Sequence, residues 1–246
     1  MSDPFVPRVG GILSADIAVP EHDREMRFYA RVLGTGDDPL WREDLMNNRG
    51  MPIIGLGERG AEHADLPLQW MPHFQVSDVG GSAERALQLG GAELMHGRDE
   101  DGRSQWAVLT DPAGAAFGLI SVVDGGSDDA DVTAGSGRIA RLALVAPDVP
   151  TAGEFYEQVV GWSAVPGDGG GLLMQRSGGV FAAEIRGADE RYANVPPVWL
   201  LSLPVGDLEE SLRRVGDGGG ELIEGSAGSG RAVIRDPVGV YLALQA

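Results

Sequence analysis

The chain has 246 residues, a net charge of −18, four histidines, no cysteine and no lysine. These counts exclude disulfides, thiolate metal sites, cysteine nucleophiles and lysine Schiff bases. The negative charge disfavours nucleic acid and anionic membranes as partners. No apolar run reaches the ~20 residues of a membrane span, and the first residues lack the pattern of a signal peptide, so we expect a cytoplasmic protein.

Hydrophobic periodicity predicts strands and helices in a regular order along the first half. A strand is followed by a helix that stops at Gly34 and then by two strand-like runs. A second series begins at Trp70 with a strand, continues with a helix and ends with three strands. The predicted ranges are 11–19 for the first strand, 41–46 and 50–56 for the strand-like runs, and 82–89 for the second helix.

The second half repeats this order. RFYARVLG at 27–34 matches EFYEQVVG at 154–161, and GAELMHG at 91–97 matches GGELIEG at 219–225. Repeats at a nearly constant offset indicate a duplicated chain. The predicted second-half ranges are strands over 162–165, 171–176 and 179–185 and a helix over 208–215. We therefore expect four βαβββ units, grouped as domain 1 over 10–123 and domain 2 over 138–246, with an acidic, Gly-rich linker over 124–137.

Each half closes with the same short motif, LTDPAGAAFGLI at 109–120 and IRDPVGVYLALQ at 234–245. Asp, Pro and Gly at positions one, two and four are typical of a type I turn. The motif is therefore first of all a predicted hairpin between the last two strands of its unit.

Four βαβββ units, a Phe-Tyr pair in the first helix and DP-x-G before the last strand resemble the vicinal oxygen chelate superfamily, which includes glyoxalase I, bleomycin-resistance proteins and extradiol dioxygenases. The tandem arrangement resembles the two-domain "hydroxylase"-like proteins of actinobacteria. The resemblance implies an α+β fold in which each pair of units curls a mixed sheet into a ligand-holding cup.

Metal-binding members of this superfamily take ligands from the first and last strands of each unit. The resemblance places those positions, in chain order, at Ser14, Gly55, Met71, Gly118, Arg141, Glu184, Leu200 and Ala243. Divalent transition metals need about three or four converging His and carboxylate ligands. Glu184 is the only residue of that kind in the set, so we expect no metal and no other cofactor.

Strand alternation then predicts which residues line the first cup. If Ser14 and Met71 face it, so do Asp16, His73 and Gln75, above Gly118. His73 is the candidate general base, and Asp16 is the candidate residue that orients it. A histidine that makes one structural hydrogen bond at a half-buried strand remains the alternative.

In the second cup, Arg141 and Glu184 are expected to form an ion pair, and Tyr241 completes a more apolar wall. Arg141 either plugs the cup or binds an anionic group of the ligand. Trp41 and Trp106 are candidates for the cup openings, because flat aromatic side chains suit flat apolar ligands. Core packing is the alternative for both tryptophans.

Two functions remain open. The first is a metal-independent tailoring enzyme of the lyase or hydroxylase type, acting on a small, largely apolar molecule such as an aromatic polyketide-like intermediate. The second is a binding protein that sequesters such a molecule or confers resistance to it. A metal-dependent glyoxalase or dioxygenase built from His73, His96 and Glu93 is a third reading. The partner is a small molecule in each case, and the sequence leaves open whether the chain forms a homodimer.

Overall fold

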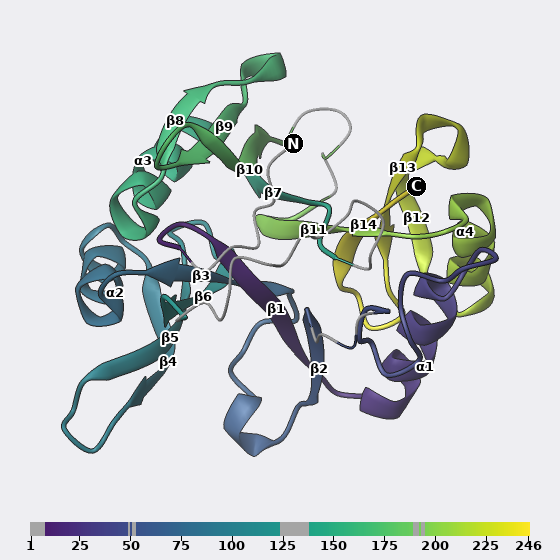
Figure 1. Cartoon of the computed structure of the whole chain (residues 1–246), viewed down its shortest axis with the longest axis horizontal. Helices are drawn as coiled ribbons and strands as arrows, with labels where there is room; N and C mark the ends of the chain where they lie inside the picture. Colours follow the sequence, from purple (N-terminus) through teal and green to yellow (C-terminus); the bar gives the residue numbers. More distant parts are fainter. Residues whose placement is uncertain (1–7, 49, 51–52, 124–137, 189–191, 193–194) are drawn as a thin grey trace. The chain divides into compact units, whose positions relative to one another are not determined.

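The computed structural model describes residues 8–48, 50, 53–123, 138–188, 192 and 195–246. The chain forms two compact units, and each unit combines segments from both halves of the sequence. The first unit contains 71–131 and 143–199, and the second contains 14–70 and 200–246. We describe each unit by itself (Figure 1).

The first unit contains two runs of four neighbouring strands, in the orders β3-β6-β5-β4 and β7-β10-β9-β8. In both runs the first strand lies parallel to its neighbour and the remaining pairs are antiparallel. The elements are β3 Met71–Val76, α2 Val79–Gln88, β4 Ala92–Arg98, β5 Ser104–Thr110, β6 Ala116–Ser121, β7 Arg141–Ala146, α3 Val149–Val160, β8 Ser163–Pro166, η2 Asp168–Gly170, β9 Leu172–Arg176 and β10 Val180–Gly187.

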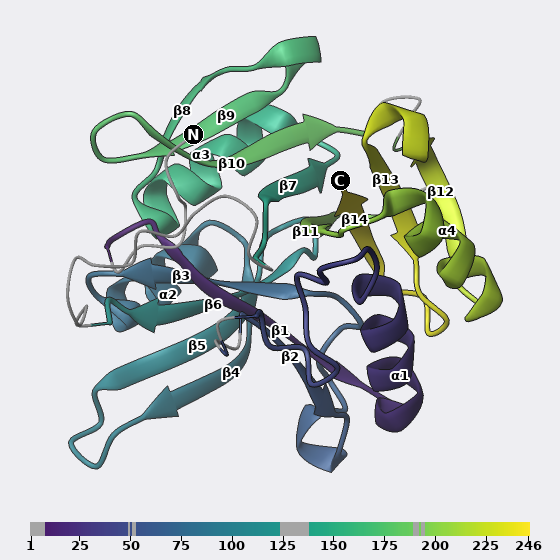
Figure 2. The same cartoon turned by 45° about the vertical axis from the view of Figure 1, so that its right-hand side comes forward.

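The second unit pairs β1 with β2 in parallel and orders four further strands as β12-β13-β14-β11. Helices α1 and α4 contact each other and lie side by side in both views (Figures 1 and 2). The elements are β1 Ile12–Val19, α1 His22–Leu33, β2 Ile54–Glu58, η1 Ala61–His63, β11 Val198–Pro204, α4 Leu208–Asp217, β12 Glu221–Ser226, η3 Ala227–Ser229, β13 Arg231–Arg235 and β14 Tyr241–Gln245.

An aromatic cluster forms the core of the first unit. Phe74 of β3 meets Trp162 at a ring-centroid distance of 4.9 Å and Trp199 at 5.4 Å, with the rings edge to face. Tyr156 of α3 lies 5.1 Å from Trp199. All four rings are at most 3% exposed. Such edge-to-face pairs add to the stabilisation from burial, so this cluster holds β3 against α3.

The repeated motifs meet through one chain of hydrogen bonds. The Trp199 indole donates to the Tyr156 hydroxyl at 3.0 Å, and that hydroxyl donates to Asp111 at 3.3 Å. The other Asp111 oxygen accepts the backbone N–H groups of Ala113 and Ala115, both at 2.9 Å. The second unit repeats the arrangement with Trp70, Tyr29 and Asp236. The DP-x-G turns do join β5 to β6 and β13 to β14, so the hairpin prediction is confirmed.

The predicted strand over 41–46 is wrong. The described residues there form isolated bridges, among them Trp41 with Asn47, and the following strand starts at Ile54. Leu45 has a positive φ of 60°, which breaks extended backbone within this stretch. The helix expected over 82–89 starts earlier, at Val79, because the Asp78 side chain accepts the Gly81 N–H at 3.0 Å and caps it.

The expected linker over 124–137 lies outside the described residues, so the boundaries of the two sequence domains remain a prediction. No helix in the described part of the chain is long and apolar enough to cross a membrane.

Candidate ligand-binding site

One face of the β3-β6-β5-β4 sheet is packed and the other is partly open. Phe74, Phe117 and Leu109 on the packed face are fully buried. The opposite face, called here the half-exposed face, carries Trp106, which is 40% exposed. Alternation along the strands and the registers between them place these eight residues among those of the half-exposed face: Met71, His73, Gln75, Met95, Trp106, Val108, Gly118 and Ile120.

Five of these eight residues were predicted as site residues: Met71, His73, Gln75, Trp106 and Gly118. The structure therefore places all five on one face of one unit, while their role in binding remains a prediction. Met71 is 4% exposed and Gln75 is fully buried, so His73 and Trp106 are the more accessible members. Sequence reasoning missed Met95 and Val108, although strand alternation gave a signal for both.

His73 lies directly over Gly118. The two residues are register partners on the parallel strands β3 and β6. A β-carbon built at Gly118 would overlap the His73 ring, with the Nε2 atom only 2.8 Å away. A side chain at position 118 would therefore displace the His73 ring from this position, because both would occupy the same space.

The second unit shows the same relation between β1 and β2. Asp16 and Gly55 are register partners, and a β-carbon at Gly55 would overlap the Asp16 carboxyl. The corresponding pairs in the second half of the chain are Ala143 with Glu184 and Ser202 with Ala243. In each pair, the residue on the first strand lies two positions after the aligned position there, and its partner is the aligned position on the last strand. The alignment of the four units by their motifs is therefore internally consistent.

Positions 55 and 118 are thus glycines whose side-chain space is filled by a neighbour. The fold family can hold a divalent metal at such positions, but glycine offers no donor, and the remaining aligned positions supply Ser14, Met71 and Glu184. Among the described residues, no group of three His, Asp or Glu side chains is placed to hold a metal ion. The described residues at these aligned positions do not fit a metal centre of the family's kind.

Glu184 is 9% exposed and forms a close ion pair with Arg186, two residues along the same strand. The Arg186 Nε and Nη2 atoms lie 2.7 and 2.6 Å from the same Glu184 oxygen. The expected pairing of Glu184 with Arg141 stays a prediction, since the division between the two units falls within β7, after Leu142.

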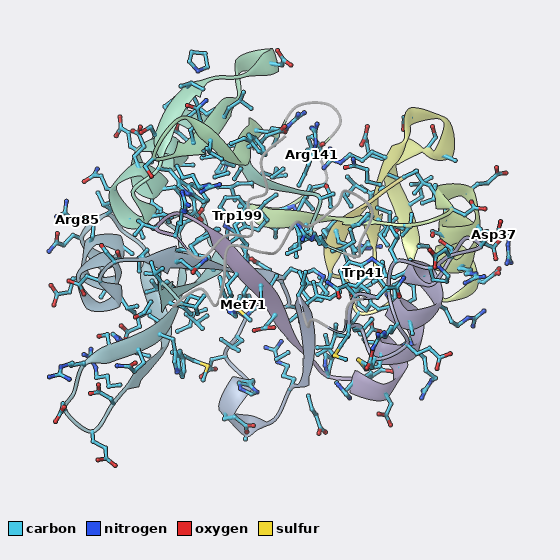
Figure 3. The ribbon with its side chains drawn as sticks, viewed as in Figure 1. Asp37, Trp41, Met71, Arg85, Arg141 and Trp199 are labelled. Carbon is cyan, nitrogen blue, oxygen red and sulfur yellow. The ribbon has the colours of Figure 1, made fainter. Side chains whose placement is uncertain are left out.

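The remaining predicted site residues lie in the second unit. Ser14 and Asp16 are half-buried on β1, and Tyr241 lies opposite Arg235 at the start of β14. Trp41 is 3% exposed, and its indole donates to the Pro204 carbonyl at 2.8 Å. This is a packed position with a satisfied N–H group, as the core alternative requires. Figure 3 labels Trp41, Met71 and Arg141 among the side chains.

Comparisons with known proteins agree with this architecture. The glyoxalase-like domain family matches residues 14–120 and 141–244. The anthracycline biosynthesis protein DauV of Streptomyces sp. (strain C5) is 29% identical over 66% of this chain, and the match spans only 59% of DauV. The protein CFP32 of Mycobacterium tuberculosis is 25% identical over 93% of this chain and 92% of its own length.

Solved structures show the same fold. The Mn(II)-bound glyoxalase from Novosphingobium aromaticivorans superposes with a TM-score of 0.55 at 19% identity, covering 96% of this chain and 82% of its own. A variant of homoprotocatechuate 2,3-dioxygenase from B. fuscum gives a TM-score of 0.56 at 17% identity, covering 96% and 70% of the two chains. Two matched segments, one in each half of the sequence, show that this chain belongs to the glyoxalase-like family as a tandem α+β member of the vicinal oxygen chelate superfamily.

Proposed function

We propose that the half-exposed face of the first unit binds a small, largely apolar aromatic molecule and that the chain acts on it without a metal ion. The role would be that of a tailoring enzyme in secondary metabolism. DauV and DnrV, two similar proteins of Streptomyces, are both named as anthracycline biosynthesis proteins. Anthracyclines carry a flat, fused aromatic chromophore, which suits a surface formed by an indole, thioethers and branched apolar side chains.

The position of His73 over Gly118 is the observation that carries this proposal. In place of a metal ligand, the strand offers a glycine, and an imidazole lies across it. Histidine is the side chain whose charge changes nearest to neutral pH, so it can take a proton from a bound phenol or from a carbon next to a carbonyl. Trp106 on the same face is exposed enough to stack on a flat ligand.

The test compares wild type with His73→Gln and uses quinizarin, a hydroxyanthraquinone, as the first probe. Binding is followed by tryptophan fluorescence, and conversion is followed by mass spectrometry after incubation of the protein with quinizarin and related hydroxyanthraquinones. We expect His73→Gln to retain affinity and to lose conversion. The matched control is His63→Gln, which changes a histidine of the second unit and should alter neither.

Trp106→Ala supplies the complementary test of the binding face. Truncation of a stacking aromatic costs about 1–3 kcal/mol of binding, so we expect affinity to fall by roughly 5- to 150-fold. If the wild-type protein binds the probe but does not convert it, the chain is a sequestering protein and not an enzyme. Unchanged affinity in Trp106→Ala together with unchanged conversion in His73→Gln would contradict the assignment of this face.

A further inference from the structure

A second constellation lies on the β4–β5 hairpin, on the face of the sheet opposite to His73. The Nε2 atom of His96 lies 2.8 Å from the Ser104 hydroxyl, and its Nδ1 atom lies 2.8 Å from a Glu93 carboxylate oxygen. A carboxylate accepts hydrogen bonds, so the Nδ1 contact assigns the ring proton to that atom. The unprotonated Nε2 then accepts the hydrogen bond from Ser104. Hydroxyl, imidazole and carboxylate are thus joined in the order of a nucleophile, its base and the group that orients the base.

Two irregularities in the hairpin create this arrangement. Residues three apart on a regular strand point to opposite faces, so Glu93 and His96 should not meet. The register between β4 and β5 shifts between Glu93 and Met95, which brings Glu93 to the face of His96. A second shift skips Gln105 on β5 and brings Ser104 to that face as well. Bulges of this kind re-aim side chains and are enriched next to active sites.

The hydroxyl of Ser104 lies beside the first turn of α2. A β-carbon built at Gly80, within that turn, would be only 3.1 Å from the Ser104 Oγ atom. The first N–H groups of a helix have no partner within the helix, and in α2 the Asp78 side chain takes that of Gly81. The N-terminal end of α2 thus lies near this hydroxyl. The positive end of the helix dipole favours an oxygen that becomes negative during attack, and a glycine at position 80 leaves the space beside Ser104 open.

Arg98 adds a positive charge to the same place. Its Nη1 atom donates to the Ser104 Oγ atom at 3.2 Å, and its Nη2 atom lies 3.4 Å from the Nδ1 atom of His96. A guanidinium beside the oxygen favours the alkoxide over the hydroxyl. The His96 side chain is 8% exposed while that of Glu93 is 39% exposed, so the base is sheltered although the hairpin itself is accessible. If His96 had only a structural role, its partner Ser104 would need neither the end of α2 nor the Arg98 guanidinium beside it.

We propose that Ser104, His96 and Glu93 form a catalytic triad that hydrolyses small carboxylic esters. The Ser104 Oγ atom attacks the ester carbonyl carbon while its proton moves to the Nε2 atom of His96. The tetrahedral adduct, with its oxyanion at Arg98 and the first turn of α2, collapses and expels the alcohol, which takes the proton from His96. Water attacks the resulting acyl-serine in the same way and releases the carboxylic acid. Glu93 is a positioning residue that holds the imidazole and stabilises its protonated form.

The first experiment is labelling of the full chain with a fluorophosphonate, followed by peptide mapping. We expect one label on Ser104 in the folded protein and none in Ser104→Ala or His96→Gln. Hydrolysis of p-nitrophenyl acetate is the second readout, and loss of the nucleophile should lower the rate by on the order of 10²–10⁴-fold. Ser82→Ala, which changes a serine on α2, is the matched control and should keep both activities. A wild-type protein that takes no label at Ser104, or a Ser104→Ala variant with undiminished hydrolysis, would overturn the triad.

Two further variants separate catalysis from a structural role of the hairpin. Glu93→Gln should lower kcat while leaving KM nearly unchanged, because the imidazole loses the carboxylate that orients it, whereas Glu93→Asp should restore part of kcat. Gly80→Ala should reduce the rate while leaving the thermal midpoint nearly unchanged. A kcat that does not respond to Glu93→Gln, or one that Glu93→Asp does not restore in part, contradicts the positioning role of Glu93. Since His73→Gln changes the opposite face of the sheet, it should leave ester hydrolysis intact, so this proposal and the proposed function fail independently.

Discussion

A buried carboxyl group in the second unit makes folding stability depend on pH in a specific direction. Glu25 lies in α1, one turn before Tyr29, and is fully buried. Burial and then repulsion from Asp236 raise the pKa of Glu25 from its ordinary value of 4.5 to about 7. Asp236 accepts the Tyr29 hydroxyl proton at 2.8 Å, and burial raises the pKa of Asp236 too. The equivalent position in α3 is Ala152, so the first unit lacks this group.

The size of the effect follows from the two pKa values of Glu25. Each pKa unit corresponds to about 1.4 kcal/mol, so ionised Glu25 costs the folded state about 3 kcal/mol at high pH. The native protein keeps the proton up to a pKa of about 7, whereas the unfolded chain releases it near 4.5. The contribution of protonated Glu25 to the free energy of unfolding is therefore fully present below pH 4.5. It is lost as the pH rises toward and through 7. Between pH 5.5 and 8.5 the loss amounts to about 2 kcal/mol.

Glu25→Gln removes this dependence. Urea unfolding of wild type and variant at pH 5.5 and 8.5, followed by tryptophan fluorescence, should show wild type losing about 2 kcal/mol relative to the variant. Glu84→Gln, on the exposed side of α2, is the matched control and should follow wild type. Parallel pH dependence in wild type and Glu25→Gln would refute the reasoning, because it would mean that the carboxyl ionises equally well in both states.

Three substitutions test other parts of the structure by the same unfolding measurement. Gly118→Ala should destabilise by about 1–3 kcal/mol, since its methyl group overlaps the His73 ring; an unchanged midpoint would mean that the ring does not lie there. Gly216→Ala, in an exposed part of α4 with no atom near the new carbon, should instead stabilise by about 0.5–1 kcal/mol, and destabilisation would contradict the helical geometry. Tyr156→Phe should lower the free energy of unfolding by about 1–3 kcal/mol, because it removes the hydroxyl that bridges the buried Trp199 indole and the Asp111 carboxylate. An unchanged free energy would contradict that link.

The sequence predicted the scaffold because its signals are local and repeated. Alternation placed Met71, His73 and Gln75 on one side of β3, and the Asp of each DP-x-G motif predicted its turn. The Phe-Tyr pair was used only as a repeat and as a motif of the superfamily, and Trp70 only as the start of the second series. Their hydrogen-bonded contact with the turn carboxylate joins residues more than 40 positions apart, and no local pattern reports such a contact.

The unpredicted features arise where a local rule is broken. Leu45 with its positive φ ended the expected strand over 41–46, and the residue itself gave no sign of that conformation. Glu93 and His96 were considered, with His73, only as possible metal ligands, and their three-residue spacing on a strand gave no sign that a bulge brings them together. Glu25 occupies a core position of an amphipathic helix, where the hydrophobic pattern predicts an apolar side chain. The folded structure instead buries a carboxyl group there, which it can do while the group is protonated.

We propose that this scaffold works without a metal ion, since glycine stands at positions 55 and 118 and a neighbouring side chain fills the space of each. Elemental analysis of protein purified without chelator, then incubated with Zn²⁺, Ni²⁺, Mn²⁺ and Fe²⁺ and desalted, tests it directly. We expect metal well below one ion per chain and ligand binding that does not respond to added metal. One tightly held ion per chain, lost when His73 is replaced, would contradict the claim.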